Sequence, residues 1–498
     1  MYDDNYLIHR LAARGDAQAR FATRPGAGDV SYGALFAGAE RMAAALQGAG
    51  VMPGDRVAMQ VSKSLEAVQL YLGTVMAGAV FLPLNTAYTG AEIGYFLGDA
   101  TPRVVVCDPA RADEIAPLAG DATVLTLAGD GSGTLAEAAT GAPPVDVCAR
   151  GGDDLAAILY TSGTTGRSKG AMLSHANLAS NSETLREVWH FSRDDVLIHA
   201  LPIFHTHGLF VATNVALLAG ASVHFLPGFD ADAIIEAMPT ASVLMGVPTF
   251  YTRLLDHPGL TPAVTANMRL FVSGSAPLLV DTHTAWRART GHRILERYGM
   301  TETNMNTSNP YEGERRAGTV GLPLPGVELR VMDGDTELPL GEIGVIEVRG
   351  PNVFQGYWQM PEKTAEELRA DGWFITGDQG LVDADGYVTI VGRAKDMVIS
   401  GGFNVYPKEV EALIDDMPGV VESAVIGVPH PDLGEAVVAV VVRRDPALGA
   451  GDVAAALAGR LARFKHPKQV VFLDALPRNT MGKVQKKTLR ADYAEVFA

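Results

Sequence analysis

Helical and strand-like patterns alternate through the first hundred residues of the chain. Residues 32–47 are alanine-rich with apolar residues at helical spacing, and a strand-like run at 56–61 follows a Pro-Gly-Asp turn. A second helical pattern covers 65–77, and a second strand-like run covers 78–82. Strands that are separated by helices pair in parallel and are covered by the helices. The sequence therefore predicts a layered α/β fold.

The length of the chain and a change of pattern near residue 390 predict more than one domain. A chain of 498 residues is too long for one ordinary hydrophobic core. Short strand-like segments separated by glycines between 327 and 391 predict a β-rich subdomain, whereas strand patterns at 420–442 and a helical pattern at 452–464 predict a small α+β domain. We expect an N-terminal α/β domain with a β-rich subdomain over 1–394, hinged to a C-terminal α+β domain over 395–498.

Charge and composition exclude several classes of protein. The net charge of −17 argues against nonspecific nucleic-acid binding, because the phosphate backbone would repel an acidic surface. Two cysteines, Cys107 and Cys148, indicate neither a disulfide framework nor a cysteine-rich zinc site. The N-terminus shows no signal-peptide pattern, and the most apolar run, 209–226, is interrupted by polar residues. We expect a soluble cytoplasmic enzyme without membrane insertion; no pattern predicts an oligomeric state.

The loop at 160–170 combines glycines, hydroxyl side chains and cations between two strand-like runs. Glycine lets backbone N–H groups turn toward an anion, hydroxyls donate further hydrogen bonds, and cations neutralise charge. This composition predicts a phosphate-binding loop, although polar hairpin loops favour the same residues. It is not a Walker A loop, because Ser168 stands where that motif requires glycine. The candidate ligands are Thr161, Ser162, Gly163, Thr164, Thr165, Gly166 and Lys169.

Two histidines, His205 and His207, follow a strand-like run after the loop. Their i, i+2 spacing is compatible with metal ligation, but no third ligand stands nearby at metal-site spacing. We therefore interpret them as structural or pocket-lining histidines.

Five short motifs follow the loop along the chain. They are Gly-Ser-Ala-Pro at 274–277, Tyr-Gly-Met-Thr-Glu at 298–302, Thr-Gly-Asp at 376–378, Gly-Arg-Ala-Lys-Asp at 392–396 and Arg-Asn-Thr-Met-Gly-Lys at 478–483. Each motif alone is a weak signal. In this order and at this spacing they resemble the signatures of adenylate-forming enzymes, a superfamily that contains acyl-CoA synthetases, luciferases and the adenylation domains of peptide synthetases. The resemblance covers 160–490, and the N-terminal α/β pattern agrees with it.

The resemblance implies roles in ATP binding. The loop would hold the β- and γ-phosphates, Thr301 would bond the phosphates, and Glu302 would coordinate Mg²⁺, a hard cation that suits carboxylate oxygens. Asp378 and Arg393 would bind the ribose, while His207 would face the substrate carboxylate or the phosphates. The other implied ATP or AMP contacts are Gly274, Ser275, Ala276, Pro277, Glu296, Arg297, Tyr298, Gly299 and Met300.

The resemblance also implies two half-reactions. A carboxylate first attacks the α-phosphate of ATP, and the thiol of coenzyme A then displaces AMP from the acyl-adenylate. Lys483 would reach the ATP site in the first step, and rotation at the hinge residue Lys395 would present another face of the C-terminal domain to coenzyme A in the second. The implied catalytic residues are Lys483, Thr301, Glu302 and His207, and the implied coenzyme A face is Gly401, Gly402 and Phe403.

Three sequence runs suggest the acid. Leu-Pro-Ile-Phe-His-Thr-His-Gly-Leu, Val-Pro-Thr-Phe-Tyr-Thr-Arg-Leu-Leu and Tyr-Gly-Met-Thr-Glu-Thr-Asn-Met are similar to runs in malonyl-CoA synthetases. Burying the second carboxylate of malonate requires a cation, and an arginine can hold it bidentately. We assign Arg253 to this carboxylate, although an arginine on the solvent face of an amphipathic helix is the simpler interpretation. Ser273, Ser275 and Met300 would shape a small acid pocket.

Other functions stay open at this stage. Methylmalonate is a second candidate acid, because one methyl group in an apolar pocket changes binding by only about 1–3 kcal/mol. A short- or medium-chain monocarboxylate-CoA ligase is the nearest alternative, and a carrier-protein adenylation module is a second one. From a different class, a catalytically silent nucleotide-binding protein is disfavoured by six residues that are all present. They are Lys169, Thr301, Glu302, Asp378, Arg393 and Lys483.

Overall fold

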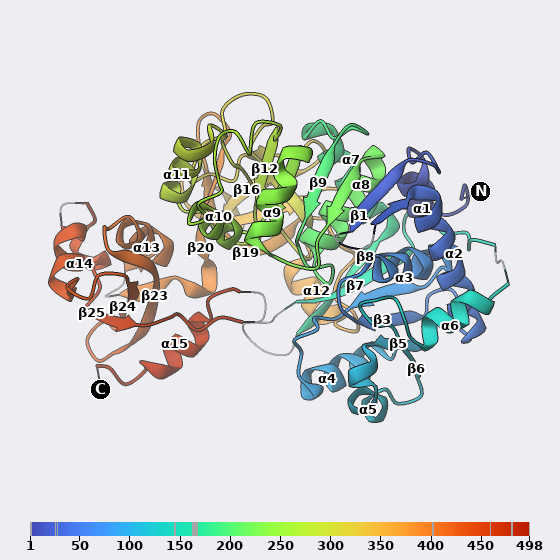
Figure 1. The fold of residues 1–498 in the computed structure, drawn as a ribbon. Helices are drawn as coiled ribbons and strands as arrows, with labels where there is room; N and C mark the ends of the chain where they lie inside the picture. The colour runs from blue at the N-terminus through green and yellow to red at the C-terminus, as the bar shows by residue number, and fades with distance from the viewer. Residues whose placement is uncertain are drawn as a thin grey trace.

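The computed structural model describes residues 2–24, 26, 28–143, 146–161, 168–400, 403–458, 460–479 and 482–497. Two large sheets dominate its N-terminal part (Figure 1). The nine-stranded sheet has the order β15 (Leu322–Pro323), β14 (Asn304–Ser308), β13 (Leu295–Met300), β12 (Leu270–Ser273), β11 (Val243–Gly246), β9 (Val196–His199), β10 (Ser222–Phe225), β1 (Arg20–Arg24) and β2 (Gly28–Ser31). The six-stranded sheet has the order β6 (Thr123–Thr126), β5 (Val104–Cys107), β3 (Arg56–Gln60), β4 (Val80–Pro83), β7 (Leu155–Thr161) and β8 (Lys169–Ser174).

The central strands of both sheets are parallel, as the sequence predicts. In the six-stranded sheet β3 pairs in parallel with β4 and β5, and in the nine-stranded sheet β11 pairs in parallel with β9 and β12. Within these two sheets, the described antiparallel pairs lie at the margins: β7–β8 in the six-stranded sheet, and β1–β2, β13–β14 and β14–β15 in the nine-stranded sheet. Ligands of open α/β sheets bind beyond the carboxyl ends of parallel strands.

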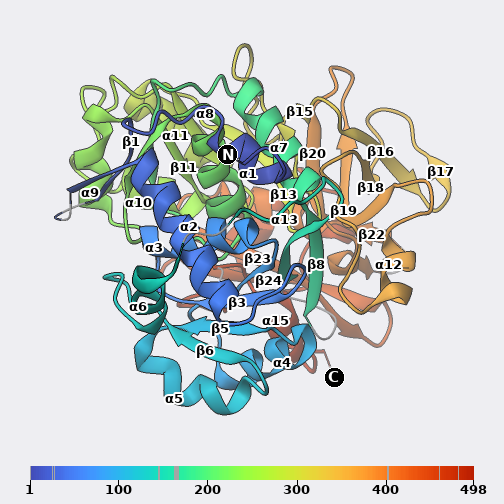
Figure 2. The same cartoon turned by 90° about the vertical axis from the view of Figure 1, so that its right-hand side faces the viewer.

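Helices cover these sheets and form two hydrophobic clusters with them, the smaller one between the six-stranded sheet and α4 and α5. The helices of this part are α1 (Tyr6–Ala12), α2 (Tyr32–Gly48), α3 (Leu65–Met76), α4 (Gly90–Ala100), α5 (Ala112–Ile115), α6 (Thr134–Gly141), α7 (His175–Val188), α8 (Asn214–Ala219), α9 (Ala231–Ala237), α10 (Pro248–Leu255) and α11 (Val280–Thr290). Several begin at side-chain caps; the Ser174 hydroxyl, for example, accepts the Asn177 N–H at 3.1 Å. The largest hydrophobic core joins residues of both sheets with α2, α3, α7 and α8 (Figure 2).

A β-rich subdomain and a small α+β domain complete the chain. The subdomain sheet has the order β17 (Thr336–Glu337), β16 (Glu328–Asp333), β18 (Gly344–Arg349), β19 (Phe374–Val382) and β20 (Val388–Arg393), with α12 (Pro361–Glu367) beside it. The last sheet has the order β22 (Phe403–Val405), β21 (Val398–Ser400), β24 (Gly434–Arg443) and β23 (Val420–His430), with β25 (Gln469–Leu473) parallel to β24. Its helices are α13 (Pro407–Asp415), α14 (Ala450–Leu457) and α15 (Lys486–Asp492).

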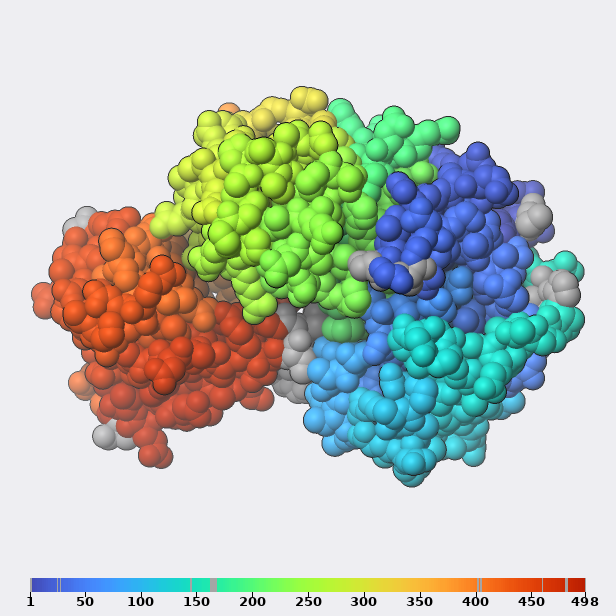
Figure 3. Space-filling view, viewed as in Figure 1, coloured from blue at the N-terminus to red at the C-terminus, as the bar shows by residue number. Residues whose placement is uncertain are grey.

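The C-terminal elements form a separate body beside the rest of the molecule (Figures 1 and 3). This body has its own apolar clusters, built from β21, β23, β24 and the helices around them. Helix α13 packs against β20, so the two parts touch next to the segment that joins them. This arrangement agrees with a small α+β C-terminal domain. In the described part of the chain, no helix is long and apolar enough to cross a membrane.

One local prediction was wrong. The helix predicted over 452–464 is α14, which ends at Leu457 because Ala458 is extended. The apolar run at 209–226 forms a buried helix followed by the strand β10, and the helix begins with a π-helical turn at His207–Thr213 before α8. The Gly208 carbonyl accepts hydrogen bonds from Thr213 Oγ1 and His199 Nε2, both at 2.9 Å, and a Cβ at Gly208 would lie 1.9 Å from the Pro202 oxygen. Only glycine fits this turn.

Candidate active site

Predicted site residues from distant parts of the chain meet beside the carboxyl ends of β12 and β13. Tyr298 on β13 donates to Asp378 Oδ2 at 2.5 Å, and Arg393 Nε lies 2.6 Å from Asp378 Oδ1. Asp378 and Arg393 are directly opposite one another in the β19–β20 pair, and Asp378 is only 5% exposed. A carboxylate has about four acceptor positions, so two stay free for a ligand that brings hydroxyl groups.

The ends of the predicted phosphate loop are paired across β7 and β8. Thr161 is paired with Lys169 in the antiparallel register, so both residues lie at the same end of the β7–β8 hairpin. Ser162, Gly163, Thr164, Thr165 and Gly166 lie outside the described residues. The Lys169 ammonium contacts Glu367 Oε2 at 2.9 Å and lies 4.0 Å from the centre of the Tyr357 ring.

Glu302 is a buried carboxylate near this lysine. Its Oε1 accepts the Tyr357 hydroxyl at 3.0 Å, and burial raises its pKa. In the described residues no group of three or more histidine, cysteine or acidic side chains is placed to hold a metal ion. Mg²⁺ usually binds one or two carboxylates together with substrate phosphates and water rather than an all-protein cage. A single buried carboxylate near Lys169, the lysine predicted to bind phosphate, therefore fits Mg²⁺ that arrives with a nucleotide.

Lys483 reaches this site from the C-terminal domain. Its side chain is exposed to solvent, yet its ammonium lies among protein groups of both domains, so desolvation lowers its pKa. Arg393 and Arg297 lower this pKa further, whereas the carboxylates Asp378 and Glu302 raise it. The structure thus brings the lysine at the end of the chain to the residues predicted to hold ATP. Thr301 is half-buried on the turn before Glu302.

A buried arginine, Arg297, lies on β13 next to Tyr298. Arg297 is 3% exposed, and among the described residues its Nε and Nη2 have no hydrogen-bond partner. Burial lowers its pKa to about 9, so it is cationic at neutral pH. A Cβ at Gly274 would lie 2.4 Å from the Arg297 Cζ, so this glycine leaves room for the guanidinium. A buried cation without a carboxylate partner indicates an anion site.

Polar groups without partners surround this arginine. His207 is buried; its Nδ1 lies 3.3 Å from Ser275 Oγ, while its Nε2 has no partner in the described part of the chain. Burial lowers the pKa of His207 well below its usual range, and Arg297 adds to this effect. The buried Ser273 hydroxyl also lacks a partner among described residues, and Ser275 has a φ of 70°, which is strained for a residue with a side chain. Buried polar groups are normally hydrogen-bonded, so these groups are candidate hydrogen-bond partners for a ligand.

The other predicted acid residues differ in exposure. Arg253 on α10 is exposed, and its Cζ lies 5.5 Å from the centre of the Phe229 ring. It makes no salt bridge or hydrogen bond with the described residues, so its assignment to a carboxylate stays a prediction. Glu296 is buried behind Arg297, where burial raises its pKa to about 8. Four more predicted contacts differ in exposure: Gly299 and Met300 at the end of β13 are half-buried, and Ala276 and Pro277 are exposed.

The predicted hinge and coenzyme A face lie beyond Arg393. Lys395 is exposed, although partial desolvation and the nearby Arg393 lower its pKa. Phe403 is 56% exposed and stacks on Phe464 at 4.7 Å between ring centres. Gly401 and Gly402 lie outside the described residues. The structure therefore shows an exposed aromatic pair on this face and leaves its role a prediction.

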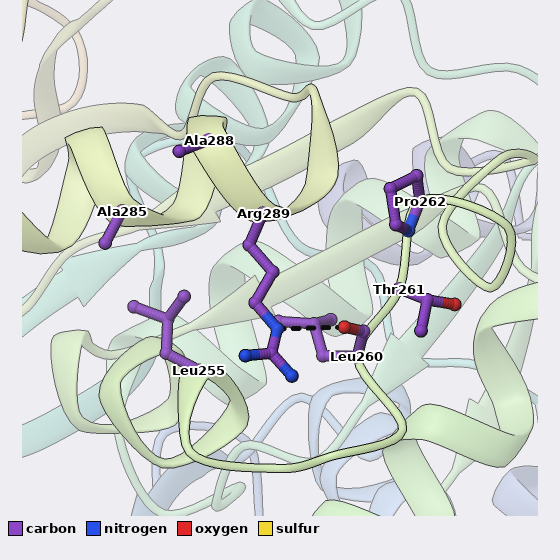
Figure 4. Close-up of a pocket in the computed structure, with 7 residues that line it drawn as sticks. All are labelled: Leu255, Leu260, Thr261, Pro262, Ala285, Ala288 and Arg289. Atoms are coloured by element: carbon purple, nitrogen blue, oxygen red, sulfur yellow. Dashed lines mark hydrogen bonds between the residues drawn. The ribbon is translucent and has the colours of Figure 1, made fainter.

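Two site neighbours escaped sequence reasoning. Tyr357 and Glu367 contact Lys169 and Glu302, but Glu367 is 198 residues from Lys169 in the chain. No local motif signals such a pair. A separate surface hollow lies between α10 and α11, where Arg289 Nε donates to the Leu260 oxygen at 2.9 Å (Figure 4). None of the predicted site residues lines this hollow.

Comparisons with known proteins agree with this geometry. The family model "AMP-binding enzyme" matches residues 9–358, and "AMP-binding enzyme C-terminal domain" matches 409–483. The ATP-bound structure of MatB from Rhodopseudomonas palustris is 61% identical, covers 99% of this chain and 100% of its own, and superposes with a TM-score of 0.97. The apo structure of the same protein, with the same identity and coverage, gives 0.86.

Curated relatives carry names for different acids. A malonate–CoA ligase of Arabidopsis thaliana is 34% identical over 481 residues, covering 89% of this chain and 79% of the relative. A feruloyl-CoA synthase of an Amycolatopsis species is 38% identical over 475 residues, covering 94% and 95%.

Proposed function

Because the chain belongs to the AMP-binding enzyme family, we propose that it is a malonate:CoA ligase that works through a malonyl-adenylate. The observation that carries the choice of acid is Arg297, a buried cation near His207 whose Nε and Nη2 have no hydrogen-bond partner among the described residues. A diacid supplies the second carboxylate that such a cation needs, whereas feruloyl or fatty acyl groups would leave it unpaired. The 61% identity with MatB and the names of the malonate–CoA ligases support the same choice.

In the first half-reaction a carboxylate oxygen of malonate attacks the α-phosphorus of ATP, and pyrophosphate leaves. Both reactants are anions, so catalysis consists mainly of positioning and of neutralising charge. Lys169 and the loop before it would hold the β- and γ-phosphates, and Lys483 would stabilise charge at the α-phosphate. Asp378 would accept the ribose hydroxyls. Mg²⁺ held by Glu302 would supply additional neutralisation of the phosphates.

In the second half-reaction the sulfur of coenzyme A attacks the acyl carbonyl, and AMP leaves with the bonding electrons of the acyl–oxygen bond. Lys483 would have to withdraw to open a path for the thiol. Rotation at Lys395 would replace it with the face that carries Phe403. The higher TM-score against ATP-bound MatB than against its apo form supports the view that this structure has the orientation for the first step.

The proposal is tested by measuring AMP release that depends on ATP and coenzyme A, with acetate, malonate, methylmalonate, succinate and octanoate as acids. We expect malonate to have the highest kcat/KM, with methylmalonate next. A preference for acetate or octanoate would favour the monocarboxylate ligase instead. Release of no AMP with any acid, despite ATP binding, would favour a silent nucleotide-binding protein.

The hinge can be tested by replacing Lys395 with proline, which fixes φ near −65° and restricts the preceding residue. We expect malonate-dependent exchange of pyrophosphate into ATP to continue, because the present orientation already supports the first step. Thioester formation from supplied malonyl-adenylate should slow by at least about tenfold, since rotation requires a large change of backbone angles at the hinge. The matched variant Lys395→Ala keeps backbone freedom and should retain both rates. Equal losses of both rates in Lys395→Pro would exclude the rotation at this residue.

A further inference from the structure

The phosphate-loop lysine already has a counter-ion in the protein. Both oxygens of Glu367 accept hydrogen bonds from the Lys169 ammonium, Oε2 at 2.9 Å and Oε1 at 3.1 Å. Lys169 begins β8, and Glu367 ends α12. About a fifth of each side chain is exposed, so water screens the pair less than it screens an ion pair on the open surface.

Glu367 is held in place by two further donors. The Tyr357 hydroxyl lies 2.5 Å from its Oε2, and the Lys363 ammonium lies 3.0 Å from its Oε1. Burial raises the pKa of Glu367, but the hydrogen bonds from Tyr357 and Lys169 lower it by more, so the carboxyl is ionised. Tyr357 is in turn fixed because it bridges to Ala171 on β8. These contacts hold the Glu367 carboxylate beside Lys169 in this structure.

We propose that Glu367 competes with the nucleotide phosphates for Lys169, and that this competition sets how readily pyrophosphate leaves. The inference rests on the proposed function, because it assumes that Lys169 binds ATP. A lysine ammonium has three N–H donors, and Glu367 engages it through both carboxylate oxygens. When the triphosphate binds, the ammonium must give up hydrogen bonds to Glu367 in order to donate to the phosphates. After pyrophosphate is formed, Glu367 competes again for these N–H donors, which lowers the affinity of the site for pyrophosphate.

The alternative role for Glu367 is to hold Lys169 in the position that phosphate requires. The two roles predict opposite results when the carboxylate is neutralised. A competitor that is removed leaves phosphate ligands bound more tightly, because the Lys169 ammonium is then free to bind them. A positioning group that is removed leaves them bound more weakly.

The experiment compares Glu367→Gln with Glu366→Gln. Glu366 lies one residue away on α12 and pairs with Lys363 at 2.6 Å, so its variant removes the same charge from the same helix without touching Lys169. Binding of ATP and of inorganic pyrophosphate is measured by calorimetry, and inhibition by pyrophosphate is measured in the AMP-release assay. We expect Glu367→Gln to bind pyrophosphate about three- to tenfold more tightly and to lower the KM for ATP, as expected for a partly screened charge. Glu366→Gln should match the wild-type protein.

A double-mutant cycle shows whether the effect of Glu367 on pyrophosphate affinity depends on Lys169. In a Lys169→Met background, Glu367→Gln should change pyrophosphate affinity no more than Glu366→Gln does. Glu367→Asp keeps the charge but shortens the side chain, and it should lie between the wild-type protein and Glu367→Gln. Weaker pyrophosphate binding in Glu367→Gln, or a gain that persists without Lys169, would overturn the inference. If the wild-type protein does not bind ATP, the proposed function fails instead.

Discussion

Replacing Lys483 with alanine is expected to abolish most adenylation while leaving thioester formation largely intact. The ammonium lies among Arg393, Asp378, Glu302 and Arg297, where it would meet charge developing at the α-phosphate. Loss of one such preorganised donor typically slows a reaction by about 10²–10³-fold, or about 2.7–4 kcal/mol. The measurement is malonate-dependent exchange of pyrophosphate into ATP, set beside conversion of supplied malonyl-adenylate to malonyl-CoA.

Lys487→Ala is a matched control for this prediction. Lys487 lies four residues away in the same basic segment, on α15, and its side chain is exposed. Lys487→Ala removes the same charge from the same domain but leaves Lys483 in place, so both half-reactions should keep their wild-type rates. A fall of similar size in both half-reactions of Lys483→Ala would show that this lysine does not act in adenylation alone.

Local patterns predicted the fold because they depend on neighbouring residues. Apolar spacing and turn residues located α2 and β3 within one residue, since amphipathic periodicity and turn-forming residues are short-range properties. No sequence pattern distinguishes the π-helix at His207–Thr213 from an α-helix, because it depends on contacts that Gly208 makes with Pro202 and His199. Helix α14 was predicted too long because continued alanine and leucine content favours a helix that tertiary packing ends.

The motif residues of the site could be predicted, but their partners could not. Tyr298 and Asp378 are 80 residues apart, and a sequence pattern names each of them without showing that they share a hydrogen bond. Glu367 belongs to no motif, and only its ion pair with Lys169 in the folded protein reveals it. Arg253 and Arg297 show most clearly what a sequence pattern does not predict. Both stand in recognisable runs, and the side-chain burial that distinguishes them is a property of the folded protein.

Replacing Arg297 with methionine should remove selectivity for malonate. Breaking a buried ion pair by removing one partner costs about 3–5 kcal/mol, so kcat/KM for malonate should fall by about 10²–10³-fold or more. Propionate has a methyl group in place of the second carboxylate, so kcat/KM for propionate should be unchanged or higher. The free variant should be at least as stable as the wild-type protein in a thermal melt, because methionine removes an unpaired buried charge. Malonate should then no longer raise its melting temperature.

The same substitution at Arg253 shows which of the two arginines binds the distal carboxylate of malonate. Arg253 is exposed and unpaired among the described residues, so it can swing toward a bound anion, but water screens its charge. We therefore expect Arg253→Met to lower kcat/KM for malonate by about tenfold or less, near 1 kcal/mol, with little change for propionate. A larger malonate-specific loss in Arg253→Met than in Arg297→Met would assign the distal carboxylate to Arg253 and leave Arg297 to the nucleotide. Equal losses for malonate and propionate in Arg297→Met would place this arginine at the phosphates, because both acids share the adenylation step.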